Sequence, residues 1–333
     1  MRADASSIRP VNTTPVLLVT AAAVAALGLY SPNTSARLPS ASAHVAPAAS
    51  QAAPPTAAAP AQVQVEATAP AAAWPADQKG LDALASKLLM GWMTTAGSGD
   101  AGAIEGALAP CFQRISFEGA FDRAGEAGQL KTIAPKDAKF SGIVATRAGD
   151  ALVVTCLMSV TETVAGKTAQ SDEQPRLGVW AIVDGSWQLV AWATFNMPSP
   201  RPAPGAPRFA GDAALNAEGE SMLKRFLSAQ HAKEMPVFEA MVSDGMQVIN
   251  FKGQKTGADI IKGASHATTD APALADTRTT RCGDLTIVTC NLAMGQKVGW
   301  STLPADPAPF LAVFRGTGDS AKVIALANTN RPK

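Results

Sequence analysis

The sequence has few of the residues from which catalytic and metal centres are most often built. Its 333 residues include four cysteines, three histidines and one tyrosine. Four cysteines are too few for a disulfide scaffold in a chain of this length. Neither a CxxC nor an HExxH spacing occurs, so the sequence predicts no metal site and no bound cofactor.

Charge is also scarce and evenly divided. Only 17% of the residues are charged, and 28 Lys and Arg face 27 Asp and Glu. Nucleic-acid grooves and polybasic membrane surfaces both depend on excess positive charge. A net charge of +1 therefore argues against a nucleic-acid partner and leaves membrane contact to the N-terminal segment alone.

The N-terminus has the layout of an export signal. Arg2 and Arg9 precede an apolar run over residues 15–30, and small residues follow it. At about 15 residues the run is shorter than the ~20 that comfortably span a bilayer. We expect residues 1–38 to direct export to the periplasm or another extracytoplasmic compartment. An Ala-x-Ala site at 41–43 lies well beyond the run, so both a cleaved signal peptide and an uncleaved anchor stay open.

Two segments are typical of spacers. Residues 39–77 consist largely of Ala, Pro, Ser, Thr and Gln, with almost no large apolar side chain. Such a segment cannot bury enough surface to offset its ordering entropy, so we expect it to be disordered. A second, Pro-rich spacer at 199–211 separates two folded segments, residues 78–198 and 212–333.

The two folded segments are copies of each other. The eleven residues 146–156 reappear at 280–290 with seven identities, at an offset of 134. The same offset aligns much of the remaining sequence without a gap, which indicates a tandem duplication.

Each copy is predicted to have an α+β fold, with two helices, a strand, a small helix and an antiparallel meander. The small helix is clearest in the second copy, where Thr256 is the expected cap of residues 256–262. Hairpin turns are expected at Gly149-Asp150 and Asp184-Gly185. The other elements are predicted at 81–92, 100–108, 112–117, 139–146, 151–164, 177–183 and 187–196.

Before the second meander stands a Phe-x-Gly-x-x-x-Gly-x-x-x-Ile segment, from Phe251 to Ile261. This order and segment resemble the nuclear transport factor 2-like (NTF2-like) superfamily, and its SnoaL-like branch in particular. The resemblance covers residues 78–198 and 212–332, although Arg123 replaces the second glycine in the first copy. It implies a curved, mainly antiparallel sheet wrapped around helices to form a cone with an apolar pocket. Members include isomerases, dehydratases and cyclases as well as non-catalytic binding modules, so the fold does not settle the function.

One face of the long strand is expected to line each cone together with a helix aromatic. The opposite face, led by Thr155 and Thr289, should point away from the helices. Such a pocket would suit a small apolar ligand. The candidate lining residues are Trp92, Phe117, Val154, Cys156, Met158, Phe226, Phe251, Val288, Cys290 and Leu292.

Two side chains are candidates for catalysis. Glu162 is the only carboxylate of the first copy that could point into the cone, but its equivalent is Gln296 and strand-end carboxylates are usually solvated. His266 follows the small helix, and a pairing with Asp259 or Asp270 could make it a general base.

Cysteine spacing within one copy gives little guidance on disulfides. Cys156 and Cys290 are equivalent mid-strand positions and should behave as small buried hydrophobes. Cys282 and Cys290 belong to one extended run of the sequence, and a single strand over this run would place them about 26 Å apart, too far to bond to each other. A Cys111–Cys156 disulfide remains an alternative that the spacing neither favours nor rules out.

The last strand of each copy is apolar on both faces. In the first copy Leu189, Ala191 and Ala193 alternate with Val190 and Trp192. A strand of this kind is normally covered on both sides, and helices can cover only one. We expect the two copies to pair through their sheets as an intrachain pseudo-dimer; a homodimer partner on each sheet is the alternative.

The sequence thus favours an exported, non-catalytic tandem module that binds a small apolar ligand or an envelope partner protein. The alternative is an isomerase-, dehydratase- or hydrolase-type enzyme that uses one cone pocket, that of the second repeat.

Overall fold

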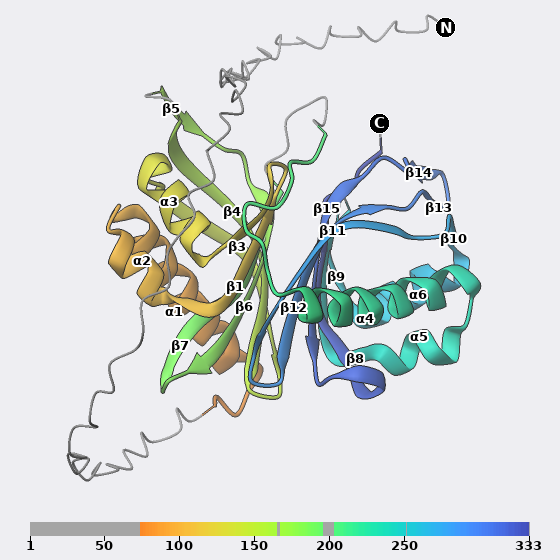
Figure 1. Ribbon diagram of the computed structural model, residues 1–333. Coiled ribbons are helices and arrows are strands. Elements are labelled where there is room, and N and C mark those ends of the chain that lie inside the picture. Colours follow the sequence, from red (N-terminus) through yellow and green to blue (C-terminus); the bar gives the residue numbers. More distant parts are fainter. Residues whose placement is uncertain (1–73, 165–166, 196–202, 251, 333) are drawn as a thin grey trace, which may run out of the picture. The chain divides into compact units, whose positions relative to one another are not determined.

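The computed structural model describes residues 74–164, 167–195, 203–250 and 252–332 (Figure 1). The expected signal or anchor at 1–38, most of the spacer at 39–77, the start of the spacer at 199–211 and Phe251 lie outside the described residues. Among the residues that are described, no helix is long and apolar enough to cross a membrane.

The first repeat combines three helices with one sheet of seven strands. The strand order is β2-β1-β7-β6-β4-β3, with β5 paired to β4. Only β1 and β7 run parallel; the other neighbours are antiparallel. The elements are α1 (Gln78–Gly97), α2 (Ala101–Ala107), β1 (Leu108–Ser116), β2 (Gly119–Asp122), α3 (Arg123–Ile133), β3 (Lys136–Ala148), β4 (Ala151–Val164), β5 (Lys167–Gln170), β6 (Gln174–Val183) and β7 (Ser186–Thr194).

The second repeat has the corresponding order, β9-β8-β16-β15-β12-β11, and adds a small sheet β10-β13-β14. The helices of each repeat gather on one face of its own sheet (Figure 1). The elements are α4 (Ala213–Ala232), α5 (Met235–Met241), β8 (Val242–Asn250), β9 (Gly253–Thr256), α6 (Gly257–His266), β10 (Thr268–Thr269), β11 (Ala273–Cys282), β12 (Leu285–Ala293), β13 (Gln296–Val298), β14 (Ser301–Leu303), β15 (Ala308–Arg315), the 3-10 turn Gly318–Ser320 and β16 (Lys322–Asn328).

The sequence offset is also a structural offset. The bounds of β1 and β8, of β2 and β9, and of α2 and α5 each differ by 134 residues at both ends. Residues 134 apart therefore occupy equivalent places in the two repeats, and the predicted α+β duplication is confirmed.

Side-chain caps fix where several helices begin. Asp77, Asp100 and Asp122 each accept a hydrogen bond from the first turn of the helix that follows. Thr256 caps α6 in a capping box with Asp259, as the sequence predicts for Thr256. The expected hairpin turns also form, since Gly149, Asp184 and Gly185 have positive φ.

The helix-facing side of the long strands has the predicted register. Val154, Cys156 and Met158 share one core cluster with Trp92 of α1. Val288, Cys290 and Leu292 share another with Phe226 of α4, while Thr155 and Thr289 point to the opposite face, where each bonds a glutamine of the other repeat.

The opposite faces of the two large sheets form one joint hydrophobic cluster. It includes Val190, Ala191 and Ala193 of β7 and Ile324 and Ala325 of β16. The expected strict alternation along β7 is therefore wrong. A bulge opposite Trp180 places Val190 and Ala191 on the same side and Leu189 with Trp192 on the helix side, because a bulge adds one residue to a strand.

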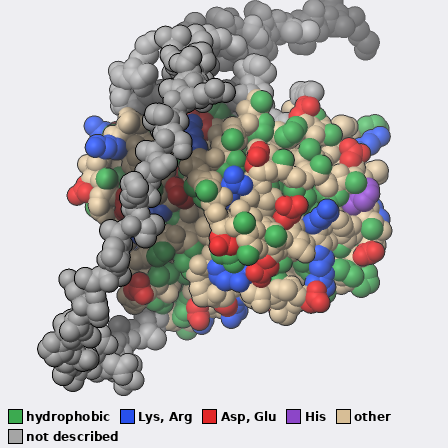
Figure 2. Space-filling view, in the orientation of Figure 1, with side chains coloured by type: hydrophobic (Ala, Val, Ile, Leu, Met, Phe, Trp, Pro, Cys, Tyr) green, Lys and Arg blue, Asp and Glu red, His purple; other side chains and the backbone are tan. Residues whose placement is uncertain are grey.

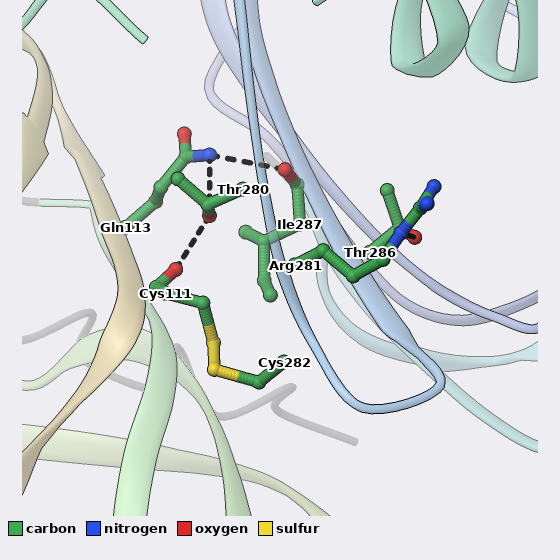
Figure 3. Close-up of a disulfide and its surroundings, with 7 residues drawn as sticks. All are labelled: Cys111, Gln113, Thr280, Arg281, Cys282, Thr286 and Ile287. Carbon is green, nitrogen blue, oxygen red and sulfur yellow. Dashed lines mark hydrogen bonds between the residues drawn. A yellow bond between two sulfur atoms is a disulfide. The ribbon is translucent and has the colours of Figure 1, made fainter. Parts of the chain in front are cut away.

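A disulfide joins the two repeats. Cys111 of β1 is bonded to Cys282 of β11, with their Cα atoms 5.6 Å apart (Figure 3). The possible Cys111–Cys156 bridge is thus wrong, because Cys156 lies on the helix side of the sheet and Cys111 in the cluster between the sheets.

On the molecular face shown in Figure 2, Lys and Arg are interspersed with Asp and Glu, so neither sign dominates it.

Candidate ligand-binding cavities

The first cavity lies between the helices and sheet of the first repeat and has a volume of about 610 Å³. This is within the usual size range of small-molecule sites. Its apolar wall is drawn from both helices and strands: Trp92, Met93, Phe117, Phe121, Leu130, Ile133, Met158 and Trp192.

Four charged side chains with little exposure also line the first cavity. Arg176 of β6 is 1% exposed, Glu126 of α3 is 3% exposed and Arg114 of β1 is 7% exposed. Glu162, near the end of β4, is partly buried beside them. Charged residues are rarely buried to this degree unless they are paired, which marks the group as unusual.

Arg114 is held in place from several directions. Its guanidinium forms an ion pair with Glu126, donates a hydrogen bond to Gln129, and lies 4.3 Å from the centre of the Phe121 ring. Gln129 in turn donates to Glu118 at 2.6 Å. This network fixes the guanidinium at the cavity wall.

Burial shifts the ionisation of the cavity's charged groups. It raises the pKa of Glu162, against the opposing effect of Arg176 and Arg114. Burial likewise raises the pKa of Glu126, opposed by Arg114. It lowers the pKa of Arg176 to about 10, so this guanidinium remains charged at neutral pH.

Burial makes the two free cysteines poor candidates for nucleophilic chemistry. Burial raises the pKa of the Cys156 thiol to about 12 and raises that of Cys290 further. Nucleophilic cysteines require the thiolate, which both environments disfavour.

The second cavity occupies the equivalent place in the second repeat and has a volume of about 420 Å³. Its inner wall is apolar and is formed by Phe226, Leu227, Val248, Ile260, Leu292, Met294, Leu303, Phe310 and Leu326. The basic residues that line it are Lys252, Lys255, Lys262 and His266, and its one acidic residue is Asp259.

Equivalent positions have charged side chains in the first cavity and uncharged side chains in the second. At the offset of 134, Arg114 corresponds to Val248, Glu126 to Ile260, Glu162 to Gln296 and Arg176 to Phe310. Every charge of the buried group in the first repeat is thus replaced by an uncharged side chain in the second.

The structure distributes the predicted lining residues between cavity and core. Trp92, Phe117 and Met158 line the first cavity, and Phe226 and Leu292 line the second. Val154, Cys156, Val288 and Cys290 lie within the core clusters beside the cavities. Phe251 lies outside the described residues.

The two catalytic candidates differ in their surroundings. Glu162 stands in the first cavity close enough to Arg176 to interact electrostatically. His266 lines the second cavity from the end of α6. Asp259 accepts hydrogen bonds from the N–H and Oγ of Thr256 at the other end of α6. Seven residues of helix separate the two by about 10 Å, and in the part of the chain that the structure describes no hydrogen bond joins His266 to Asp259 or Asp270.

Sequence reasoning missed Arg114, Glu126 and Arg176. An arginine within a strand normally indicates a solvent-facing position. The available signal was the comparison of the two copies, in which charged residues on strands and on the small helix stand 134 positions from apolar ones.

Neither a protein-family model nor a curated protein matches the sequence. Similar solved structures include an NTF2-like protein from Cytophaga hutchinsonii, with 16% identity, 35% of this chain and 97% of that chain covered, and a TM-score of 0.32. An NTF2-like protein of unknown function in nutrient uptake from Rhodospirillum rubrum has 19% identity, coverages of 34% and 94%, and a TM-score of 0.30. Aln2 from a Streptomyces species has 11% identity, coverages of 37% and 93%, and a TM-score of 0.30.

Each of these alignments spans about one repeat of this chain and nearly the whole of the other protein. The topology of this chain is that of two α+β repeats in tandem, each with a mainly antiparallel sheet.

Proposed function

We propose that this chain is an exported small-molecule-binding module, and that the first cavity binds a compact ligand with an apolar body and an uncharged polar group. The observation that carries the proposal is the group of little-exposed charged side chains, Arg114, Glu126, Glu162 and Arg176, beside the apolar part of the cavity wall. Pockets of this kind use a few fixed polar groups to orient a ligand.

The balance of charge favours a neutral ligand. Three arginines and three glutamates line the first cavity: Arg114, Arg176, Arg208, Glu118, Glu126 and Glu162. A neutral group that both donates and accepts hydrogen bonds, such as an amide, matches a guanidinium beside a carboxyl. An ionic ligand would add one charge without a partner in a desolvated site.

Export is supported by the bond between Cys111 and Cys282. Structural disulfides persist in oxidising compartments such as the periplasm and are rare in the cytosol. The Arg-flanked apolar run of residues 15–30 supports the same proposal.

We further propose that the repeats pair within one chain, so that the protein is monomeric. The joint cluster between the sheets and the Cys111–Cys282 bond support this. Light scattering of the full-length chain should give the mass of one chain; a stable dimer would contradict the pairing.

Three probes with one aromatic body test the ligand class. Isothermal titration of the full-length chain carrying Lys255→Gln/Lys262→Gln, which removes two cationic side chains from the second cavity, would compare 2-naphthamide, 2-naphthoate and 2-naphthylmethylammonium. We expect the neutral amide to bind about tenfold more tightly than either ion, a difference of about 1.4 kcal/mol. Equal binding of the three, or preference for an ion, would contradict the proposal.

Glu162→Gln provides the matched variant, because glutamine is the residue at the equivalent position of the second repeat. Removing one negative charge should shift the preference of the first cavity toward 2-naphthoate. Glu239→Gln, which removes an exposed carboxylate outside both cavities, should leave the preference unchanged.

The raised pKa of Glu162 favours proton transfer as a second candidate function. In this alternative the Glu162 carboxylate takes a proton from a carbon next to a ligand carbonyl, and Arg176 stabilises the resulting enolate. Deuterium exchange at the α-carbons of 2-tetralone, followed by NMR, tests it. Acceleration by the full-length chain and its loss in Glu162→Gln would favour catalysis; no acceleration would exclude this reaction.

A further inference from the structure

The second cavity combines an apolar interior with a cationic mouth. Val248, Ile260 and Phe310 stand where the first repeat has the buried charged side chains Arg114, Glu126 and Arg176. The interior can therefore exclude water from an apolar ligand without leaving a buried charge unpaired.

The basic residues of this cavity come from the segments at its edge. Lys252 precedes β9, Lys255 is in β9, Lys262 is in α6, and His266 ends α6. Among the described residues that line this cavity, Asp259 alone has a carboxylate, and that carboxylate is engaged in the capping box with Thr256. The three lysines and Asp259 thus give the described lining an excess of two positive charges.

This cationic lining is particular to the second repeat. The positions equivalent to Lys252, Lys255 and Lys262 are Glu118, Phe121 and Gly128 in the first repeat. The fold that the two repeats share therefore does not require lysines at these positions. They occur in the repeat whose cavity interior lacks the buried charged side chains.

From these observations we propose that the second cavity binds an anionic amphiphile, with the apolar part inside and the anionic head at Lys252, Lys255 and Lys262. This is a second site, distinct in place and ligand from the first cavity. Burial of the apolar part supplies affinity, and the lysines select the sign of the head group.

Decanoate, decanol and decyltrimethylammonium, each below its micelle concentration, test the proposal by isothermal titration of the full-length chain. Decanoate should bind at least threefold more tightly than decanol, and the cation most weakly. Its affinity should rise by about fourfold per methylene from hexanoate upward until the cavity is full. Salt should weaken decanoate binding but not decanol binding.

The lysines are tested with Lys255→Gln/Lys262→Gln, which should weaken decanoate binding by about 3- to 30-fold and leave decanol unchanged. Lys87→Gln/Lys224→Gln removes two exposed lysines outside the cavity and is the matched control. Equal binding of decanoate and decanol, or equal effects of the two double variants, would overturn the proposal. Neither outcome of this test bears on the binding of 2-naphthamide to the first cavity.

An anionic head could belong to a free acid or to a lipid in a bilayer. Sedimentation with phosphatidylglycerol vesicles distinguishes the two sources. Decanoate binding without co-sedimentation assigns a free amphiphile, whereas co-sedimentation that is lost in Lys255→Gln/Lys262→Gln assigns a bilayer lipid. Failure of both decanoate and vesicles to bind would refute the proposal.

Discussion

Gln113 and Gln247 occupy equivalent positions in the two repeats, and each side chain bonds the sheet of the other repeat. Gln113 Nε2 donates to the Ile287 carbonyl at 3.0 Å (Figure 3), and Gln247 Nε2 donates to the Val153 carbonyl at 2.9 Å. Thr289 and Thr155 donate their hydroxyls back to the two amide oxygens. Both glutamines are almost fully buried, so this reciprocal pattern fixes the register between the sheets.

Gln113→Ala and Gln247→Ala should each lower the free energy of unfolding by about 2–4 kcal/mol, because each leaves buried polar partners without a hydrogen bond. The two losses should be similar, since the contacts are equivalent. Chemical denaturation measures both.

Gln254→Ala is the control for these variants. Gln254 also bonds the other repeat, through the Gly142 carbonyl at 2.8 Å, but in an exposed position. Its loss should cost less than about 1 kcal/mol. A cost equal to that of Gln113→Ala would show that burial of the glutamines is not what matters.

Loss of the disulfide should destabilise the pairing of the repeats. Cys111→Ser and Cys282→Ser each open a crosslink between residues 171 positions apart and should cost about 2–4 kcal/mol. The double variant should cost no more than the larger single loss. Reductant should lower the melting temperature of the wild-type chain and leave that of the variants unchanged. A wild-type melting temperature that does not change with reductant would contradict the Cys111–Cys282 disulfide.

The stability contributed by Glu162 should fall as the pH rises. Its folded-state pKa is raised above the ordinary value of 4.5 by burial, so the folded chain holds this proton at pH values where the unfolded chain has lost it. The contribution is complete below about pH 4.5 and disappears as the pH passes the folded-state pKa. The free-energy difference between wild type and Glu162→Gln should therefore turn against the wild type as the pH rises above about 4.5. A free-energy difference that does not depend on pH would show that the pKa of the Glu162 carboxyl is not raised in the folded chain.

Replacing one charged residue of the first cavity should lower the free energy of unfolding more than replacing two. Arg176→Phe leaves the Glu162 carboxyl without the nearby guanidinium and should lower the free energy of unfolding by about 2–4 kcal/mol. Adding Glu162→Gln gives the pair of residues found in the second repeat, Phe310 and Gln296, and should recover at least about 1 kcal/mol. Strictly additive losses would show that Arg176 and Glu162 are not coupled.

The sequence was sufficient for the features that depend on periodicity and duplication. The offset of 134, the small helix after Thr256 and the helix-facing register of Val154 and Cys156 all follow from patterns along one chain. Because each pattern appears twice, the second copy checks the first.

Features that depend on contacts between distant segments were not readable in this way. The bulge near Val190 changes which side chains share a face, and no local residue type requires it. Cys111 and Cys282 come from non-equivalent positions of the two repeats, so spacing within one copy cannot pair them. Arg176 is buried because other groups of the cavity compensate its charge, which hydrophobic periodicity does not register.

If the cavity of each repeat takes its own class of ligand, the two ligands should not compete. Isothermal titration of the full-length chain with 2-naphthamide, in the absence and presence of saturating decanoate, measures this competition. We predict that each probe binds once per chain and that saturation with decanoate leaves the affinity for 2-naphthamide unchanged. Displacement of one probe by the other, or loss of 2-naphthamide binding in Lys255→Gln/Lys262→Gln, would contradict the assignment of a separate ligand class to each cavity.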